Sequence, residues 1–248
     1  MIIVRLMIER AMKPLCVFLF AQRAVKTSAF FTPITTVQRL DGIVQRRVSE
    51  SFDFSSTEAW EDYYQFQKVD VVTEWHSSVP MKTLASLVPP DADAVVMVGC
   101  GSSLLPEHIQ KHRPGVRLIL QDSSETCLQM LQQRYGSSMS YIRGDATRLS
   151  ESLDGSVDVI YDKGLMDAIF CNEGWNKPIR SLLEESSKVL NEDGIYILVS
   201  YRLPQSTKEF LEDVGSKNHL AWTFDLSASN NRVGVSVARK RTRCLVTP

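Results

Sequence analysis

From residue 57 onward, short strand-like runs alternate with longer segments whose apolar residues recur at helical spacing. The runs typical of buried parallel strands are 94–98, 117–121, 139–143, 157–161 and 195–200. The helical segments begin at Thr57, the expected N-cap, and continue at 81–88, 104–111, 125–135 and 178–190. Two late runs, 220–226 and 233–239, flank a turn rich in Ser and Asn and predict a hairpin.

This alternation predicts an α/β fold with a doubly wound, Rossmann-like, mostly parallel sheet and a C-terminal antiparallel hairpin. Right-handed crossovers would place helices on both faces of the sheet. Ligands of such sheets bind beyond the carboxyl ends of the strands. Candidate chemistry is therefore expected in the loops after Val98, Gln121, Arg143 and Tyr161.

The charge of the chain is distributed unevenly, although the net charge is only -1. Residues 1–48 carry eight basic and two acidic side chains, whereas the rest carries 20 basic and 27 acidic ones. We interpret 1–48 as a basic targeting segment or a disordered extension, and 49–248 as the folded domain. The mitochondrion is the expected destination, with the plastid and the cytoplasm as alternatives. The apolar run 14–21 is too short to span a bilayer, so no membrane span is expected.

The loop after the first strand, Gly99-Cys100-Gly101, is the first candidate site. Glycines permit positive φ and close backbone approach, and the following helix offers free N–H groups. The third glycine of a dinucleotide fingerprint is missing, which favours an uncharged sugar and a methionyl group over a pyrophosphate. The alternative is a simple tight turn. The five cysteines include no C-x-x-C pair, so no metal is expected.

The next two loops each supply an acid. Asp122, followed by Ser123, comes 23 residues after Gly99 and can accept hydrogen bonds from both ribose hydroxyls. Its alternative role is to cap the following helix. Asp145, followed by Ala146, can accept a hydrogen bond from an adenine amino group, or it is an ordinary loop-surface acid.

The loop after the fourth strand begins with Asp162-Lys163-Gly164. Asp162 is a candidate for orienting an incoming amine or contacting the cofactor. The alternative is a helix cap with a salt bridge to Lys163. Trp75 is interpreted either as a wall of the substrate channel, where its face can stabilise a cation, or as a core residue. Lys163 is assigned to the same channel.

Five motifs together resemble the seven-β-strand, S-adenosylmethionine-dependent methyltransferases. They are Trp60-Glu61-x-x-Tyr64, Glu74-Trp75, Gly99-Cys100-Gly101-x-Ser103, Asp122-x-Ser124 and Asp162-Lys163-Gly164-x-x-Asp167-Ala168. Within that family the chain looks most like the group that methylates lysines in elongation factor 1A and mitochondrial citrate synthase. The resemblance implies seven strands with the last hairpin inserted antiparallel. It also implies that Gly99, Gly101, Asp122 and Asp145 hold S-adenosylmethionine.

Three positions depart from the pattern of that group. Ser123 stands between Asp122 and Ser124 where that group has Ile. Ser102 stands where Asn often follows G-C-G, which need not disturb the cofactor cradle. His76 stands where Tyr commonly follows E-W, and it either changes the substrate or lies on the surface. Trp60 and Tyr64, four residues apart, are expected to pack against each other on a helix.

The predicted function is S-adenosylmethionine-dependent methylation of a lysine in a protein substrate. Such an amine must lose its proton before it attacks the methyl group, and burial in an apolar channel lowers its pKa. The alternatives are a small-molecule acceptor and a non-catalytic, cofactor-binding assembly factor. A nicotinamide dehydrogenase is a weaker option because the third glycine is missing. No nucleic acid is expected, since the domain after residue 48 is acidic and lacks an aromatic and basic stripe.

Overall fold

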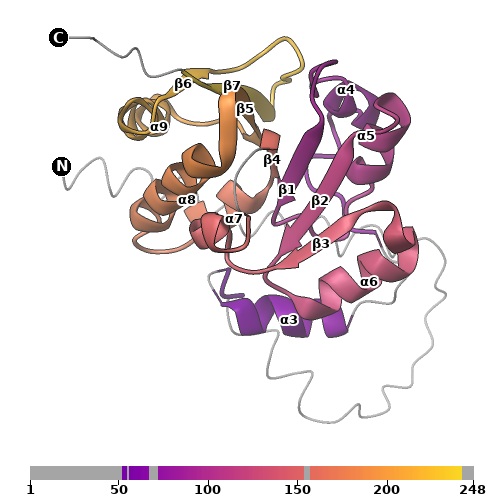
Figure 1. Cartoon of the computed structure of the whole chain (residues 1–248). Coiled ribbons are helices and arrows are strands. Elements are labelled where there is room, and N and C mark those ends of the chain that lie inside the picture. Colours follow the sequence, from indigo (N-terminus) through magenta and orange to yellow (C-terminus); the bar gives the residue numbers. More distant parts are fainter. Residues whose placement is uncertain (1–51, 55, 67–71, 154–156, 242–248) are drawn as a thin grey trace, which may run out of the picture.

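The computed structural model describes residues 52–54, 56–66, 72–153 and 157–241. Within these residues, seven strands form one sheet in the order β3-β2-β1-β4-β5-β7-β6 (Figure 1). The strands are β1 Ala94–Val98, β2 Arg117–Asp122, β3 Ser140–Arg143, β4 Val157–Lys163, β5 Leu190–Tyr201, β6 Leu220–Thr223 and β7 Val233–Lys240. Strands β1 to β5 pair in parallel, whereas β7 runs antiparallel between β5 and β6. The predicted fold class is confirmed.

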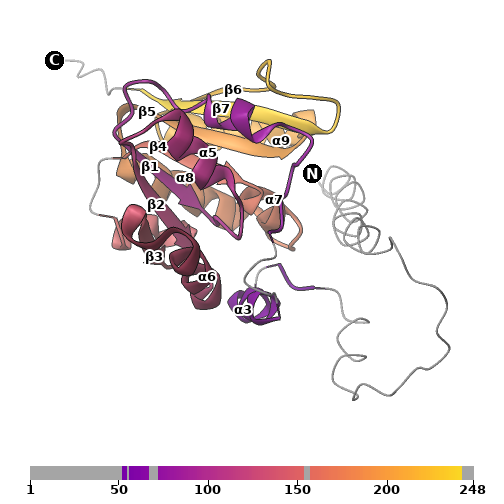
Figure 2. The ribbon, with the colours of Figure 1, turned by 90° about the vertical axis from the view of Figure 1, so that its right-hand side faces the viewer.

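Helices cover both faces of this sheet (Figures 1 and 2). The α-helices are α3 Thr57–Gln65, α4 Met81–Ala85, α5 Leu105–His112, α6 Glu125–Tyr135, α7 Leu165–Phe170, α8 Asn176–Val189 and α9 Gln205–Lys217. Two 3₁₀ turns, η1 Gly136–Ser138 and η2 Ala146–Glu151, flank β3. Helix α3 lies beside α6, below the carboxyl ends of β1 and β2 in Figure 1.

The alternation of side chains along each strand divides the interior into two cores. Val95 and Met97 of β1 face the core that contains apolar residues of α4, α5 and α6. Val96 and Val98 face the opposite core, which contains those of α7, α8 and α9. Because β1 is apolar on both faces, its run is continuous rather than alternating, as expected for a buried parallel strand.

The predicted boundaries differ from the observed ones where pairing or capping decides the end of an element. Strand β4 continues to Lys163 because Asp162 pairs with Val98 and Lys163 with Val199 of the neighbouring strands. Ser56, not Thr57, is the N-cap of α3, since its side chain accepts a hydrogen bond from the N–H of Ala59. The sequence did not predict α7, which is only six residues long, or α9.

The basic segment 1–48 lies outside the described residues, so its targeting role and the boundary at residue 49 stay predictions. None of the helices in the described part of the chain has both the length and the apolar composition needed to cross a bilayer.

Helix α9 packs closely on the sheet at Gly215. A Cβ there would lie 2.7 Å from the carbonyl oxygen of Leu220 and 2.8 Å from the indole of Trp222. We expect Gly215→Ala to lower the free energy of unfolding by about 1–3 kcal/mol through overpacking, despite a gain in helix propensity of about 1 kcal/mol. Urea denaturation measures this change.

Gly144→Ala is the matched control, because its Cβ would meet only the Ser152 hydroxyl, at 3.4 Å. Equal stability of Gly215→Ala and the unmodified protein would contradict the assigned packing.

Candidate functional site

A cavity of about 320 Å³ opens at the carboxyl edge of the sheet. Its walls come from α3, from the segment 73–75, and from the loops that follow β1, β2, β3 and β4. This size lies at the lower end of the range for small-molecule sites. The predicted residues that line it are Gly99, Cys100, Gly101, Asp122, Ser123, Asp145, Ala146, Trp75 and Lys163. The structure therefore brings together every predicted site residue except Asp162.

The loop after β1 requires both of its glycines. Gly99 and Gly101 each have φ of +54°, a conformation that side chains disfavour. A Cβ at Gly99 would lie 2.9 Å from Leu165, and one at Gly101 would lie 2.9 Å from the Tyr64 hydroxyl. Cys100 between them is buried, and burial raises the pKa of its thiol. The loop thus offers backbone, rather than a reactive thiolate, to the cavity.

Asp122 ties the loop after β1 to the turn after β2. Its carboxylate accepts hydrogen bonds from the N–H groups of Gly101 and Ser124, both at 3.0 Å. Burial raises the pKa of Asp122, and the same two N–H groups oppose that rise. The N-cap of α6 is Ser124 rather than Asp122. Asp122 therefore stands at the cavity wall, braced by backbone donors, where a ribose would meet it.

Asp145 and Ala146 form the wall beyond β3. The Asp145 side chain accepts a hydrogen bond from the N–H of Thr147 at 2.8 Å and caps the turn η2. Asp145 is exposed and also lines the cavity, whereas Ala146 is buried. Asp145 thus lies at the surface and in the cavity wall, and its predicted contact with an adenine amino group stays a prediction.

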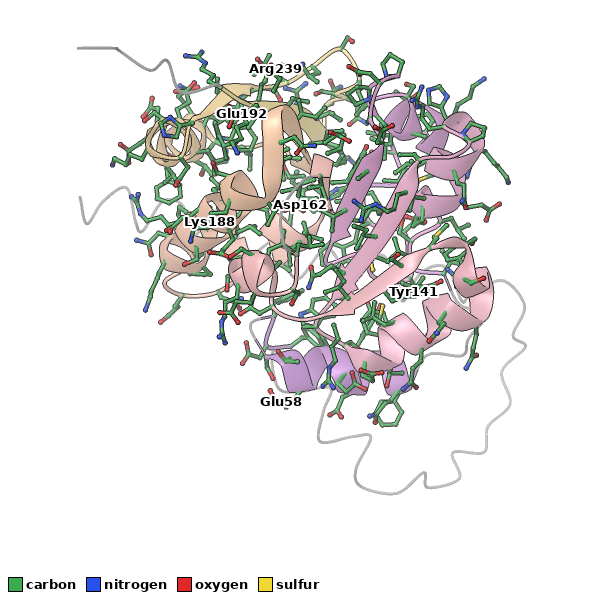
Figure 3. All side chains as sticks on the ribbon, viewed as in Figure 1. Glu58, Tyr141, Asp162, Lys188, Glu192 and Arg239 are labelled. Atoms are coloured by element: carbon green, nitrogen blue, oxygen red, sulfur yellow. The ribbon has the colours of Figure 1, made fainter. Side chains whose placement is uncertain are left out.

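Asp162 does not line the cavity, which contradicts its predicted contact with the amine or the cofactor. Its side chain points to the α7–α8 face of the sheet and is 0% exposed, in the interior of the molecule (Figure 3). The carboxylate accepts hydrogen bonds from the N–H groups of Leu165 and Met166 and from the Tyr196 hydroxyl at 2.7 Å. The capping alternative is correct for Asp162, because its carboxylate accepts hydrogen bonds from N–H groups in the first turn of α7. Its supposed salt bridge to Lys163 is wrong.

Lys163 faces the other side of the sheet and pairs with Glu74. Its ammonium lies 3.0 Å from the Glu74 carboxylate and donates to the carbonyl of Trp75 at 3.1 Å. Burial lowers the pKa of Lys163, and Glu74 opposes that shift. Glu74 also accepts hydrogen bonds from the Ser103 hydroxyl and the N–H of Leu104, at the start of α5. The Lys163 charge is thus neutralised within the wall.

Trp75 directly follows Glu74, and its carbonyl accepts the hydrogen bond from Lys163. A Cβ at Gly164 would lie 2.9 Å from its indole ring, so the ring packs directly on the loop after β4. Its centroid is 6.2 Å from that of Trp60 and 6.5 Å from that of Phe54. Trp75 is therefore part of an aromatic cluster and of the cavity wall at once.

His76 is buried, so its interpretation as a surface residue is wrong. Its Nε2 lies 2.8 Å from the Asp167 carboxylate, and its ring packs edge-on against Tyr201. Asp167 also accepts a hydrogen bond from the N–H of Tyr201 at 3.2 Å. His76 thus fastens the segment after Trp75 to α7 and to the end of β5.

Sequence reasoning missed the extent of the aromatic cover. Phe54, Trp60, Tyr63 and Tyr64 all line the cavity. The predicted packing of Trp60 on Tyr64 is confirmed, with ring centroids 6.3 Å apart and planes inclined by 27°. The spacing of aromatic residues along α3 was the available signal, but nothing local indicated which surface α3 would cover.

Comparison with known proteins relates this geometry to one family. A family model described as a methyltransferase domain matches residues 95–194. A Mus musculus protein, "eEF1A lysine and N-terminal methyltransferase", is 27% identical over 76% of this chain and 28% of its own length. The Homo sapiens protein of the same name is 29% identical over 60% of this chain and 22% of its own length. The chain thus spans about a quarter of the length of these relatives.

Solved structures share the fold at low sequence identity. The YcgJ protein from Bacillus subtilis matches with a TM-score of 0.53 and 13% identity, over 67% of this chain and all of that one. A TehB-like SAM-dependent methyltransferase from Corynebacterium glutamicum matches with a TM-score of 0.52 and 16% identity, over 75% of this chain and 98% of that one. The predicted family is confirmed at the level of a methyltransferase domain.

The buried carboxyl group of Asp162 predicts a pH dependence of stability. Burial raises the pKa of Asp162 to about 7, and hydrogen bonds from Tyr196 and Met166 limit the rise. Between its unfolded pKa of about 3.9 and this value, the folded state holds a proton that the unfolded state releases. Asp162 therefore lowers stability as the pH rises through this range, by up to about 4 kcal/mol.

Asp162→Asn abolishes this titration, so its unfolding free energy should fall less between pH 5 and pH 8 than that of the unmodified protein. Urea denaturation at both pH values measures the difference. Parallel pH profiles for the two proteins would refute the assignment.

Proposed function

Because this chain carries a methyltransferase domain on a Rossmann-like sheet, we propose that it transfers the methyl group of S-adenosylmethionine to lysine side chains of a protein. The observation that carries the proposal is the brace between Asp122 and the loop after β1. Two glycines at positive φ and one buried carboxylate are fixed to each other at the cavity wall. This arrangement is suited to a ribose and its flanking uncharged groups.

The residues present fit such a cofactor. Asp122 can accept hydrogen bonds from the ribose hydroxyls, and Asp145 can accept one from the adenine amino group. Gly99 and Gly101 adopt positive φ, and the backbone of this loop thereby lines the cavity. When bound, the sulfonium supplies an activated methyl group, so the protein needs no covalent nucleophile. The chain's task is to orient the acceptor and keep water out.

The acceptor side of the cavity supports an amine. Trp75 offers an aromatic face, which attracts a cation, and its backbone is held by Lys163. Lys163 would repel an ammonium if it were unpaired, but Glu74 neutralises it at 3.0 Å. The name shared by the mouse and human relatives, an eEF1A lysine and N-terminal methyltransferase, supports a protein acceptor and makes elongation factor 1A the first substrate to test.

We also propose the mitochondrion as the destination, on the basis of the basic segment 1–48. Residues 1–48 fused to a fluorescent protein should direct it to mitochondria. A diffuse cytoplasmic signal, or delivery to plastids in an algal host, would overturn this assignment.

The activity is tested with the 248-residue chain, labelled S-adenosylmethionine and purified elongation factor 1A, and then with a cell extract in place of the factor. We expect label on lysine, located by mass spectrometry. Asp122→Asn should weaken binding of the cofactor at least about tenfold, because hydrogen bonds to a charged group contribute about 1.5–3 kcal/mol. Asp213→Asn, which removes an exposed carboxylate of α9, is the control and should bind normally.

The alternatives give different results in the same assay. If the label were confined to small molecules, the acceptor would be a small molecule and not a protein. Binding without turnover on any extract would indicate a non-catalytic assembly factor. Absence of cofactor binding would reject the proposed function.

A further inference from the structure

Glu61 connects helix α3 to the start of α6, next to the cavity residues Asp122 and Ser123. Its carboxylate accepts a hydrogen bond from the Ser124 hydroxyl at 2.6 Å and from the N–H of Thr126 at 3.2 Å. The Thr126 hydroxyl donates to the same carboxylate. Burial works against ionisation of Glu61, but these hydrogen bonds outweigh it and leave its pKa below the usual value. Hydrogen bonds to a charged carboxylate are stronger than those between neutral groups, so this one side chain holds α3 firmly to the start of α6.

The donors belong to the turn that also positions Asp122. Ser124 is the N-cap of α6, and its hydroxyl accepts from the N–H of Cys127 while it donates to Glu61. Its own N–H donates to Asp122. The residues 122–126 therefore hold the cavity wall on one side and α3 on the other.

The same helix presents its aromatic residues to the cavity. Trp60, Tyr63 and Tyr64 line the cavity, and Thr57 at the start of α3 lines it too. Tyr64 is buried, and its hydroxyl lies against Gly101. Glu61 is thus a charged, polar tie on a helix that otherwise meets the site mainly through aromatic side chains.

We infer that Glu61 is a positioning residue that holds α3 over the cavity and slows the release of the nucleoside cofactor. The inference rests on the proposed function for the identity of that ligand. The inference goes beyond the proposed function because it assigns control of the cofactor's release rate to Glu61, which does not line the cavity. If α3 must move to let the cofactor leave, weakening this tie raises the dissociation rate.

Hydrogen exchange and stopped-flow tryptophan fluorescence of the full-length protein test the inference. Glu61→Ala removes the tie, and Glu61→Gln preserves the shape of the side chain if the alanine variant folds poorly. Amide hydrogens of 60–65 should exchange about tenfold faster in the variants, since the lost hydrogen bonds involve a charged group. The dissociation rate of S-adenosylmethionine should rise by a similar factor, and the KM for it should rise while kcat stays within twofold.

Glu58→Gln is the matched control, because Glu58 lies on the exposed face of α3 and points away from the sheet (Figure 3). It should leave the exchange of 60–65 and the dissociation rate unchanged. Glu61 would be a cap of α6 alone if exchange rose only in residues 125–135 of the variants, and this result would overturn the inference. An unchanged dissociation rate would overturn it as well.

The two proposals fail in different ways. If the unmodified protein binds no S-adenosylmethionine, the proposed function fails and the assigned effect on release fails with it. If it binds the cofactor but the Glu61 variants release it at the same rate, only the inference about Glu61 fails.

Discussion

The structure depends on how backbone N–H groups are satisfied where the parallel strands end. Each helix that follows a strand begins with N–H groups that lack partners within the helix, and burial makes such groups costly to leave unpaired. Four carboxylates meet this need: Asp122 for the loop after β1, Asp162 for α7, Glu74 for α5 and Glu61 for α6. Negative charge is also favoured at a helix N-terminus. The cavity lies at the edge of the sheet where these loops and helix ends meet.

These carboxylates come from two sources. Asp122 and Asp162 both lie on strands. Asp162 serves the helix that follows it directly, whereas Asp122 serves the turn after its own strand and the earlier loop after β1. Glu74 and Glu61 precede the whole sheet and reach helices 30 and 65 residues further along the chain. The segment before the sheet is therefore bound through polar groups at helix ends as well as through its aromatic rings. Lys163 balances the charge of Glu74, so this pair is neutral within the wall.

The fold could be predicted from the sequence because buried strands and helices have distinct spacing, and the order of elements leaves few topologies. Most residues of the cavity wall could be predicted because they directly follow strands, and the loops at the carboxyl ends of parallel strands meet at one edge of the sheet. Asp162 was assigned wrongly because β4 continues two residues past its apolar run, and alternation then turns the side chain to the other face. The partners of Glu61, Glu74 and His76 could not be predicted, because they are distant in sequence and no local pattern specifies them.

The family match begins at residue 95, after α3. The helix that covers the cavity thus lies outside the matched region, whereas the loops at the strand ends that form the rest of the wall lie inside it. Trp60, Tyr63 and Tyr64 of this helix line the cavity. A substitution at one of them can therefore reshape the cavity without altering any residue of the matched domain.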